Sequence, residues 1–205
     1  FVGGGNMAIA IIGGLLARGH AAGDIVVAER EPGQRESLET RFGIRTEASP
    51  GAQFACADVI VLAVKPQQMR EAVAPLLPLL GGQLVVSIAA GIRLADLSRW
   101  LGGYATLVRA MPNTPALVHA GITGLHAAAG ISGAQREAAT ALLSAVGDVV
   151  WFDDEAMLDA VTAVSGSGPA YVFYFIEALE QAARELGLTP AQARQLAGQT
   201  FAGSV

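Results

Sequence analysis

The 205-residue sequence predicts an α/β fold, with a doubly wound, mostly parallel sheet followed by an all-helical carboxyl-terminal region. Short apolar runs ending in small or polar residues alternate with helical stretches as far as Phe152, and no strand pattern occurs from Asp153 onward. Only 15% of the residues are charged and 52% are hydrophobic. A sheet covered on both faces, or a subunit interface, would bury that apolar surface. We therefore expect two domains, residues 1–153 and 154–205.

The sequence opens with a strand end that passes through a glycine turn into a helix, Phe1-Val2-Gly3-Gly4-Gly5-Asn6-Met7-Ala8. Gly3, Gly5 and Ala8 fit the pattern G-x-G-x-x-G/A, which allows a tight turn, close approach to a pyrophosphate and close helix–strand packing. The helix expected from Asn6 to about Arg18 would aim its free N–H groups at that anion. This spacing indicates a Rossmann-type dinucleotide site, although such glycines can also serve only a tight turn.

The second strand, Asp24–Ala28, ends in Glu29-Arg30, about 20 residues past the glycine turn, where Rossmann folds read the adenosine ribose. Glu29 would accept a hydrogen bond from a 2′-hydroxyl, whereas Arg30 would pair with a 2′-phosphate or stack on adenine. Both could instead be solvated charges at a strand end. A polar helix from Pro32 to about Phe42 and a brief strand or turn at 43–45 follow.

A nearly continuous apolar strand, Asp58–Val64, ends in Lys65-Pro66. Ligands bind outside the carboxyl ends of strands in open α/β sheets, so Lys65 would lie near the cofactor ribose or nicotinamide unless it is only a surface lysine. Pro66 suits the first position of the next helix, which should not run past Pro75 and Pro78.

Two further strands end in residues suited to a site. Leu84–Ile88 is followed by Ala89-Ala90-Gly91, which is small enough for a ring to pass close to the backbone. After a helix at Leu94–Trp100, the strand Ala105–Ala110 runs into Met111-Pro112-Asn113-Thr114-Pro115, a rigid polar loop. The remaining elements of this part are a strand from Gly121 to Ala128, a helix from the Ser132-x-x-Gln135 capping box to about Ala145, and a strand at Asp148–Phe152.

The last part of the sequence predicts helices that pack against a second subunit. A helix through Met157 and Val164 reaches a loop or kink at Ser165–Pro169, and a helix from Ala170 to Leu186 follows. A capping box at Thr189 starts another helix. Because Tyr171–Ile176 is apolar all the way round, we expect it to be buried between subunits of a homodimer, or of a higher homo-oligomer.

Composition excludes several function classes. The net charge is −5 and the basic residues are scattered, so we expect no nucleic acid and no anionic membrane as partner. The one cysteine, Cys56, is expected to fill the core, and the histidines lie far apart without metal-ligand spacing. The longest apolar run, Met7–Ala17, is shorter than the roughly 20 residues that span a bilayer. With no visible signal peptide, we expect a soluble cytoplasmic protein that takes a small metabolite.

Five motifs resemble one family, pyrroline-5-carboxylate reductase, over essentially the whole sequence. They are Val2-Gly3-Gly4-Gly5-Asn6-Met7-Ala8, Leu62-Ala63-Val64-Lys65-Pro66-Gln67, Ser87-Ile88-Ala89-Ala90-Gly91, Arg109-Ala110-Met111-Pro112-Asn113-Thr114-Pro115, and the stretch from Asp159 through Val164-Ser165-Gly166-Ser167-Gly168-Pro169 to Tyr171. The resemblance implies a Rossmann domain, a helical domain that interlocks with a second subunit, and NAD(P)H-dependent reduction of 1-pyrroline-5-carboxylate to proline. Such chemistry needs placement of the nicotinamide at the imine carbon and a proton, but no covalent nucleophile.

Site residues follow from the motifs together with the resemblance. Those expected at the cofactor are Gly3, Gly5, Asn6, Met7, Ala8, Glu29, Arg30, Ala63, Val64, Lys65, Pro66, Ala90 and Gly91, and those expected on the substrate side are Pro112, Asn113, Ser165 and Ser167. The two serines could instead only start a helix. We expect NADP as cofactor, with NADPH preferred and NADH usable, no metal, and no assigned catalytic residue.

The sequence also departs from the family pattern and leaves rival functions open. Members continue into a Ser-Pro-Gly-Gly-Thr-Thr-like substrate motif that is absent here, so we expect the chain to be incomplete; many also carry an adenosine-binding Asn where Glu47-Ala48-Ser49-Pro50 stands. Another imine or 2-hydroxyacid reductase would place a lysine after the domain junction, and 153–205 contains none. A non-catalytic nucleotide-binding dimerisation module would not explain polar loops at three strand ends.

Overall fold

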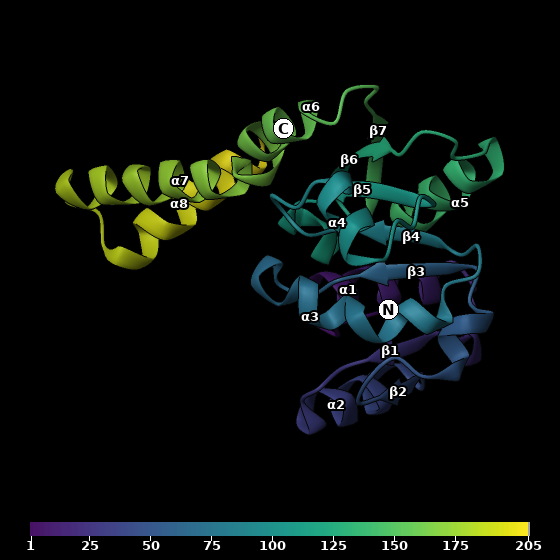
Figure 1. Cartoon of the computed structure of the whole chain (residues 1–205). Helices are drawn as coiled ribbons and strands as arrows, with labels where there is room; N and C mark the ends of the chain where they lie inside the picture. Colours follow the sequence, from purple (N-terminus) through teal and green to yellow (C-terminus); the bar gives the residue numbers. More distant parts are fainter. Residues whose placement is uncertain (205) are drawn as a thin grey trace.

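The computed structural model describes residues 1–204 as a helix-covered sheet from which two long helices project (Figure 1). The strands are β1 (Val26–Ala28), β2 (Arg45–Glu47), β3 (Val59–Leu62), β4 (Leu84–Ser87), β5 (Leu107–Met111), β6 (Gly121–Ala127) and β7 (Gly147–Trp151). The α-helices are α1 (Asn6–Ala17), α2 (Pro32–Phe42), α3 (Met69–Val73), α4 (Leu94–Trp100), α5 (Gly133–Ser144), α6 (Met157–Val161), α7 (Gly168–Glu185) and α8 (Pro190–Ala202). We call the part up to β7 the sheet domain, and α7 with α8 the helical arm.

The segment around Val2 connects the strand pair β1-β2 to the five strands that begin with β3. Val2 pairs in parallel with Ala28 of β1 on one side and with Leu62 of β3 on the other. Beyond β3 the order is β3-β4-β5-β6-β7, and β2 lies outside β1. Every pairing is parallel except β5 with β6, which is antiparallel. This is the mostly parallel, doubly wound sheet that the sequence predicts.

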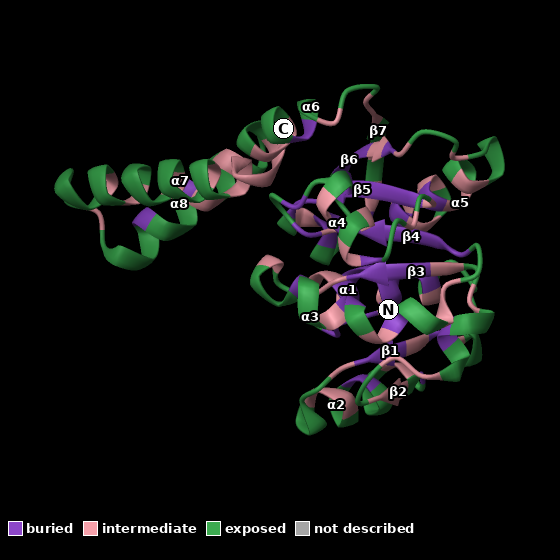
Figure 2. Ribbon diagram, viewed as in Figure 1, coloured by how far each residue is buried: buried purple, intermediate pink, exposed green. Residues whose placement is uncertain are grey.

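Alternating side chains of the strands enter two apolar clusters. Val86 packs in the cluster that contains α1 and α5, whereas its neighbour Val85 packs with α3 and α4. Figure 2 shows β3, β4 and β5 mostly buried between these helices, whereas the outer strands β2 and β7 have only intermediate and exposed residues. Because side chains alternate along a strand, a run that is apolar at every position needs cover on both faces, and this explains the low charge content.

Of two local expectations about the middle of the sheet domain, the end of the α-helix before the prolines is confirmed and the burial of Cys56 was wrong. The α-helix does stop at Val73, but 3-10 turns carry the chain through both prolines over Ala74–Leu79. Proline lacks a donor yet keeps its carbonyl acceptor, and a short 3-10 segment tolerates that loss. Cys56 is exposed at the end of the 3-10 turn Ala52–Cys56, where Phe54 fills the core instead.

The loop or kink expected at Ser165–Pro169 takes the form of a π turn followed by a bend at Ser167, not of an open loop. Residues Thr162–Gly166 make a π turn, closed where the Ser167 N–H donates to the carbonyl of Thr162 at 2.8 Å. The chain therefore stays helical from α6 into α7, with Pro169 at the start of α7, where its missing N–H costs nothing.

The helical arm exposes aromatic side chains in the single chain. The capping box at Thr189 starts α8, which packs along α7 and brings Phe201 to 6.1 Å from Phe175 between ring centroids. Tyr174 is nevertheless 75% exposed and Phe173 61% exposed, and most of the arm is drawn as exposed in Figure 2. The burial expected for this segment is thus not supplied by the described part of the chain itself. None of the described helices has the length and apolar content that crossing a membrane requires.

Candidate active site

A cleft of about 400 Å³ lies at the carboxyl ends of β1, β3 and the short strand around Val2. Its walls come from the glycine turn, the loop 48–50 and the helical turns on either side of α3. Of the residues predicted at the cofactor, those that line this cleft together are Gly3, Gly5, Glu29, Arg30, Ala63, Val64 and Lys65. The cleft is therefore at the sheet edge where ligands bind in open α/β folds.

The three glycines of the turn have different constraints. Gly3 has φ +95°, and a Cβ there would lie 2.7 Å from the carbonyl oxygen of Ala63. A Cβ on Gly4 would lie 2.6 Å from Cδ1 of Leu38, whereas one on Gly5 would have nothing within 4 Å. Gly3 is thus required by the fold, a Cβ on Gly4 would displace the end of the Leu38 side chain, and Gly5 keeps space open on the cleft side.

The amino end of α1 faces this space without a capping side chain. Gly5 is the N-cap residue, so the first N–H groups of a 12-residue helix have no side-chain acceptor. Ala8, the third small residue of the motif, is fully buried against the sheet. Asn6 is exposed and Met7 half-buried at the start of the helix. An open glycine beside free helical N–H groups fits a pyrophosphate.

Glu29 is bonded to the glycine turn itself. Its Oε2 accepts from the N–H of Gly4 at 2.8 Å, and its Oε1 accepts from the N–H of Glu31 at 3.0 Å. Nε2 of Gln34 donates to the carbonyl of Gly4 at 2.6 Å, so the turn is held from both sides. The carboxylate predicted to read a ribose hydroxyl already has this structural role, which sequence reasoning missed.

Two cations border the cleft. Arg30 forms an ion pair with Glu71 of α3 at 2.9 Å, and both side chains are more than half exposed. An exposed pair of this kind contributes about 0–1 kcal/mol, so a phosphate could replace the carboxylate as partner. Lys65 is exposed at the end of the β3 segment, next to Pro66, which begins a 3-10 turn rather than an α-helix.

Of the predicted substrate-side residues, Pro112 and Asn113 follow β5, whereas Ser165 and Ser167 lie in the π turn and just before α7. Asn113 is almost buried, and its Oδ1 accepts from the N–H of Ile122 at 3.0 Å while Nδ2 donates to the carbonyl of Ser165 at 3.2 Å. The Ser165 hydroxyl donates to the carbonyl of Val161 at 3.0 Å. Pro112 is buried beside Asn113. The structure thus brings this loop against the π turn, with the Asn113 amide fastening the two together.

Three other predicted residues lie apart from that contact. Ala90 and Gly91 are exposed after β4, and Gly91 has φ +75°, a conformation that favours glycine. Neither lines the cleft, although both lie at the same edge of the sheet. Ser167 precedes α7 without capping it through its side chain.

A buried charge cluster escaped the sequence prediction. Arg109 of β5 is 2% exposed, and its guanidinium bonds Glu155 at 3.2 Å and Asp159 at 3.4 Å. The sequence carried one signal of this cluster: an arginine within an apolar strand needs a charged partner when it is buried. The partners lie 46 and 50 residues further along the chain, and no local pattern identifies them.

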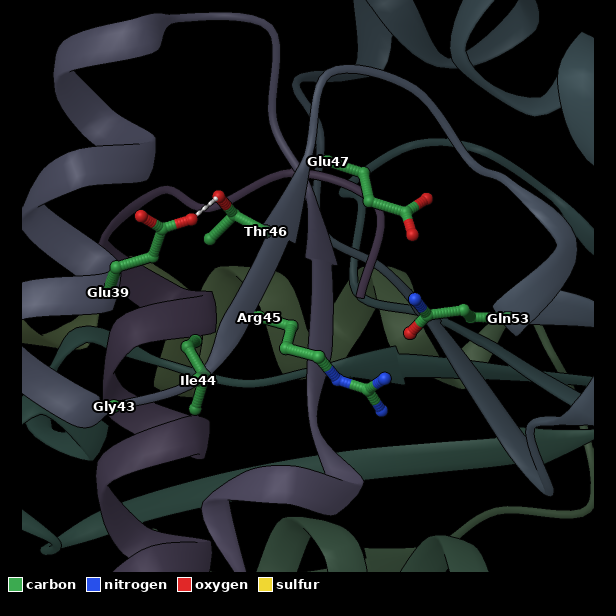
Figure 3. A pocket seen from close by; sticks show the side chains of 7 residues that line it. All are labelled: Glu39, Gly43, Ile44, Arg45, Thr46, Glu47 and Gln53. Carbon is green, nitrogen blue, oxygen red and sulfur yellow. Dashed lines mark hydrogen bonds between the residues drawn. The ribbon is translucent and has the colours of Figure 1, made fainter.

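A second hollow, of about 460 Å³, lies along the edge strand β2 (Figure 3). Its polar groups serve local bonds: Thr46 donates to Glu39, and Arg45 donates to the carbonyl of Gly23 at 2.9 Å. It lies away from the glycine turn, and carboxylates border it. We therefore place the candidate site at the glycine turn. Fold and cleft together define a class of proteins with a Rossmann-type dinucleotide-binding domain and a helical second domain.

Known proteins identify the family within that class. Residues 1–91 match the family described as NADP oxidoreductase coenzyme F420-dependent, and residues 155–205 match the one described as pyrroline-5-carboxylate reductase dimerisation. The pyrroline-5-carboxylate reductase of Pseudomonas aeruginosa is 49% identical over 205 residues, which cover 100% of this chain and 75% of that protein. The chain belongs to the pyrroline-5-carboxylate reductase family and is an NAD(P)H-dependent oxidoreductase.

Solved structures agree with this assignment. A pyrroline-5-carboxylate reductase from Coxiella burnetii superposes with a TM-score of 0.92 at 40% identity, covering 99% of this chain and 76% of that one. The pyrroline carboxylate reductase of Plasmodium falciparum, solved with NADP bound, gives 0.86 at 27% identity and covers 100% and 75%. The chain thus spans about three quarters of the length of these relatives.

Gly5→Val tests whether the glycine turn holds the pyrophosphate. A Cβ at Gly5 meets no protein atom but projects into the cleft, so we expect NADPH binding to weaken at least tenfold, or about 1.4 kcal/mol, while the protein stays folded. Calorimetric titration and thermal unfolding measure the two quantities. Gly4→Ala is the control variant for a structural effect. Its new Cβ would meet Cδ1 of Leu38, so this substitution should lower the stability of the protein. Parent-like NADPH affinity in Gly5→Val would show that the turn is structural only.

Proposed function

We propose that this protein reduces 1-pyrroline-5-carboxylate to L-proline, with NADPH preferred as hydride donor. The observation that carries the proposal is the 49% identity to a pyrroline-5-carboxylate reductase over the whole chain. The open glycine turn at the cleft supports it independently, because it fits the pyrophosphate of the cofactor. The proposed division is a dinucleotide domain at 1–153 and a dimerisation and substrate domain at 154–205, and a cytoplasmic location stays a prediction.

The chemistry asks the protein to position reactants rather than to attack them. Bound NADPH supplies the hydride, which goes to the imine carbon while a proton goes to the ring nitrogen. In our proposal Gly5 and the amino end of α1 bind the pyrophosphate, and Lys65 contributes positive charge beside them. The small Ala90-Gly91 segment admits the nicotinamide ring, and the Pro112-Asn113 loop shapes the substrate side.

The direct test is oxidation of NADPH by the natural full-length chain in the presence of 1-pyrroline-5-carboxylate. We expect turnover with that cyclic imine, and none with a 2-oxo acid. Turnover with the 2-oxo acid would instead support a hydroxyacid reductase. NADPH binding without oxidation of any of these compounds would support the non-catalytic module.

Cofactor choice depends on Arg30 in this proposal. The carboxylate of Glu29 accepts hydrogen bonds from Gly4 and Glu31, so its charge is partly engaged, whereas the guanidinium of Arg30 pairs, within residues 1–204, only with the exposed Glu71. A guanidinium fork forms charge-assisted hydrogen bonds to a phosphate, and the same group can stack on adenine when no phosphate is present. NADPH should therefore be preferred by about tenfold, with NADH still used.

Arg30→Ala should erase or reverse this preference. The KM for NADPH should rise with little change in kcat, because the contact is far from the reacting carbon and acts alike in ground and transition states. Steady-state kinetics with both cofactors measure the change. Glu71→Gln is the matched control: it frees Arg30 and should keep or strengthen the preference. Equal losses with both cofactors would mean that Arg30 only stacks, and a parent that prefers NADH would show that Glu29 decides.

We also propose a homodimer, or a higher homo-oligomer, built on the helical arm. The exposed aromatic side chains of α7 support it, since a contiguous apolar face is unfavourable in water. The match of residues 155–205 to a dimerisation family supports it as well.

Replacing Phe173 and Tyr174 together by Asp should give monomers or lose the folded arm, because carboxylates would be placed on the proposed interface. Phe175 is left in place because it packs on Phe201 of the same chain. Light scattering and circular dichroism measure mass and helicity. Val118→Asp, at a 74% exposed apolar position of the sheet domain, is the control and should keep the parent mass. A parent protein that is a stable monomer would refute this proposal.

A further inference from the structure

The buried guanidinium of Arg109 is neutralised from outside the sheet domain. Its bonds go to Glu155, just before α6, and to Asp159 within α6. The carboxylate of Glu155 is mostly covered, whereas that of Asp159 is 60% exposed and also lies 3.8 Å from Arg93. A buried charge needs such partners, so the ion pairs fasten the start of the helical region onto β5.

The Glu155 oxygen that bonds Arg109, Oε1, also accepts a hydrogen bond from a second element. Oε1 accepts from the backbone N–H of Leu94, the first residue of α4, at 2.8 Å. Arg93, at the N-cap, provides no side-chain cap for α4, so Glu155 supplies the acceptor that this helix end lacks. One carboxylate therefore connects α4, β5 and the approach to α6.

The two elements held by Glu155 lead to opposite sides of the proposed reaction. α4 begins three residues after Gly91, which with Ala90 forms the segment proposed to admit the nicotinamide. β5 continues from Arg109 into Pro112 and Asn113, the loop proposed for the substrate side. Misplacement of reacting groups by about 1 Å can cost a hundredfold in rate, so a common anchor for both segments matters.

We infer that Glu155 is a positioning residue that sets the nicotinamide segment 89–91 against the substrate loop 111–115. The inference rests on the proposed function. Asp159 shares the partner Arg109 but reaches the end of α4 only through the exposed side chain of Arg93, at 3.8 Å, whereas Glu155 bonds the backbone of α4. This difference separates positioning from simple charge neutralisation. Glu155→Ala and Asp159→Ala are therefore a matched pair.

Glu155→Ala should lower kcat at least tenfold, leave the KM and dissociation constant for NADPH within twofold, and enlarge the kinetic isotope effect with NADPH deuterated at the transferred position. Asp159→Ala should lose stability but keep the parent isotope effect. Glu155→Gln retains an oxygen for Leu94 and should fall between Glu155→Ala and the parent, which keeps the test open if the alanine variant unfolds. Proportional losses of kcat and stability in both alanine variants, with unchanged isotope effects, would overturn the inference.

Hydrogen exchange gives a readout that needs no turnover. Amides 89–94 should exchange faster in Glu155→Ala and at the parent rate in Asp159→Ala. Equal exchange in the two variants would overturn the anchoring role. If the parent oxidises no NADPH with 1-pyrroline-5-carboxylate, the proposed function fails while the exchange comparison still tests the anchor.

Discussion

The pairing of Val2 between β1 and β3 is the constraint on which the site depends. The backbone of this segment is hydrogen-bonded on both sides: Val2 donates to Val61 and Gly3 donates to Ala28, each at 2.8 Å. Because the chain leaves this strand toward β1 on one side and later reaches β3 on the other, the crevice opens where the strand order reverses. The glycine turn, Glu29 and Lys65 meet there only because three parallel strands end at one edge.

Local physics accounts for most of the fold that the sequence predicts. α2 and α4 occur with the predicted bounds, and the capping boxes at Ser132 and Thr189 form with both reciprocal bonds. Proline, glycine and cap positions act within a few residues, and the buried strands show themselves by unbroken apolar runs. Such signals need no knowledge of the distant chain.

What the sequence could not predict depends on groups brought together from far apart. The engagement of Glu29 with Gly4 joins residues 25 positions apart, and the Arg109 cluster joins β5 to the start of the helical region. The exposure of Cys56 depends on which side of a short 3-10 turn faces Phe54 and the core, and composition carries no information about that. The sequence was enough to place most of the predicted site residues at strand ends, but it could not identify their hydrogen-bond partners.

The π turn determines how the faces of the helical arm are oriented. An ordinary helix advances about 100° and 1.5 Å per residue, so the additional residue held in Thr162–Gly166 rotates every later side chain by more than a quarter turn. The π turn, closed by the Ser167 N–H on the carbonyl of Thr162, thus sets the direction of the face that carries Phe173 and Tyr174, some three helical turns away. In evolution, a one-residue deletion in this turn would rotate the helical arm relative to the sheet domain while leaving the contacts between α7 and α8 intact. Such a deletion would therefore change which surface of the arm meets a second chain.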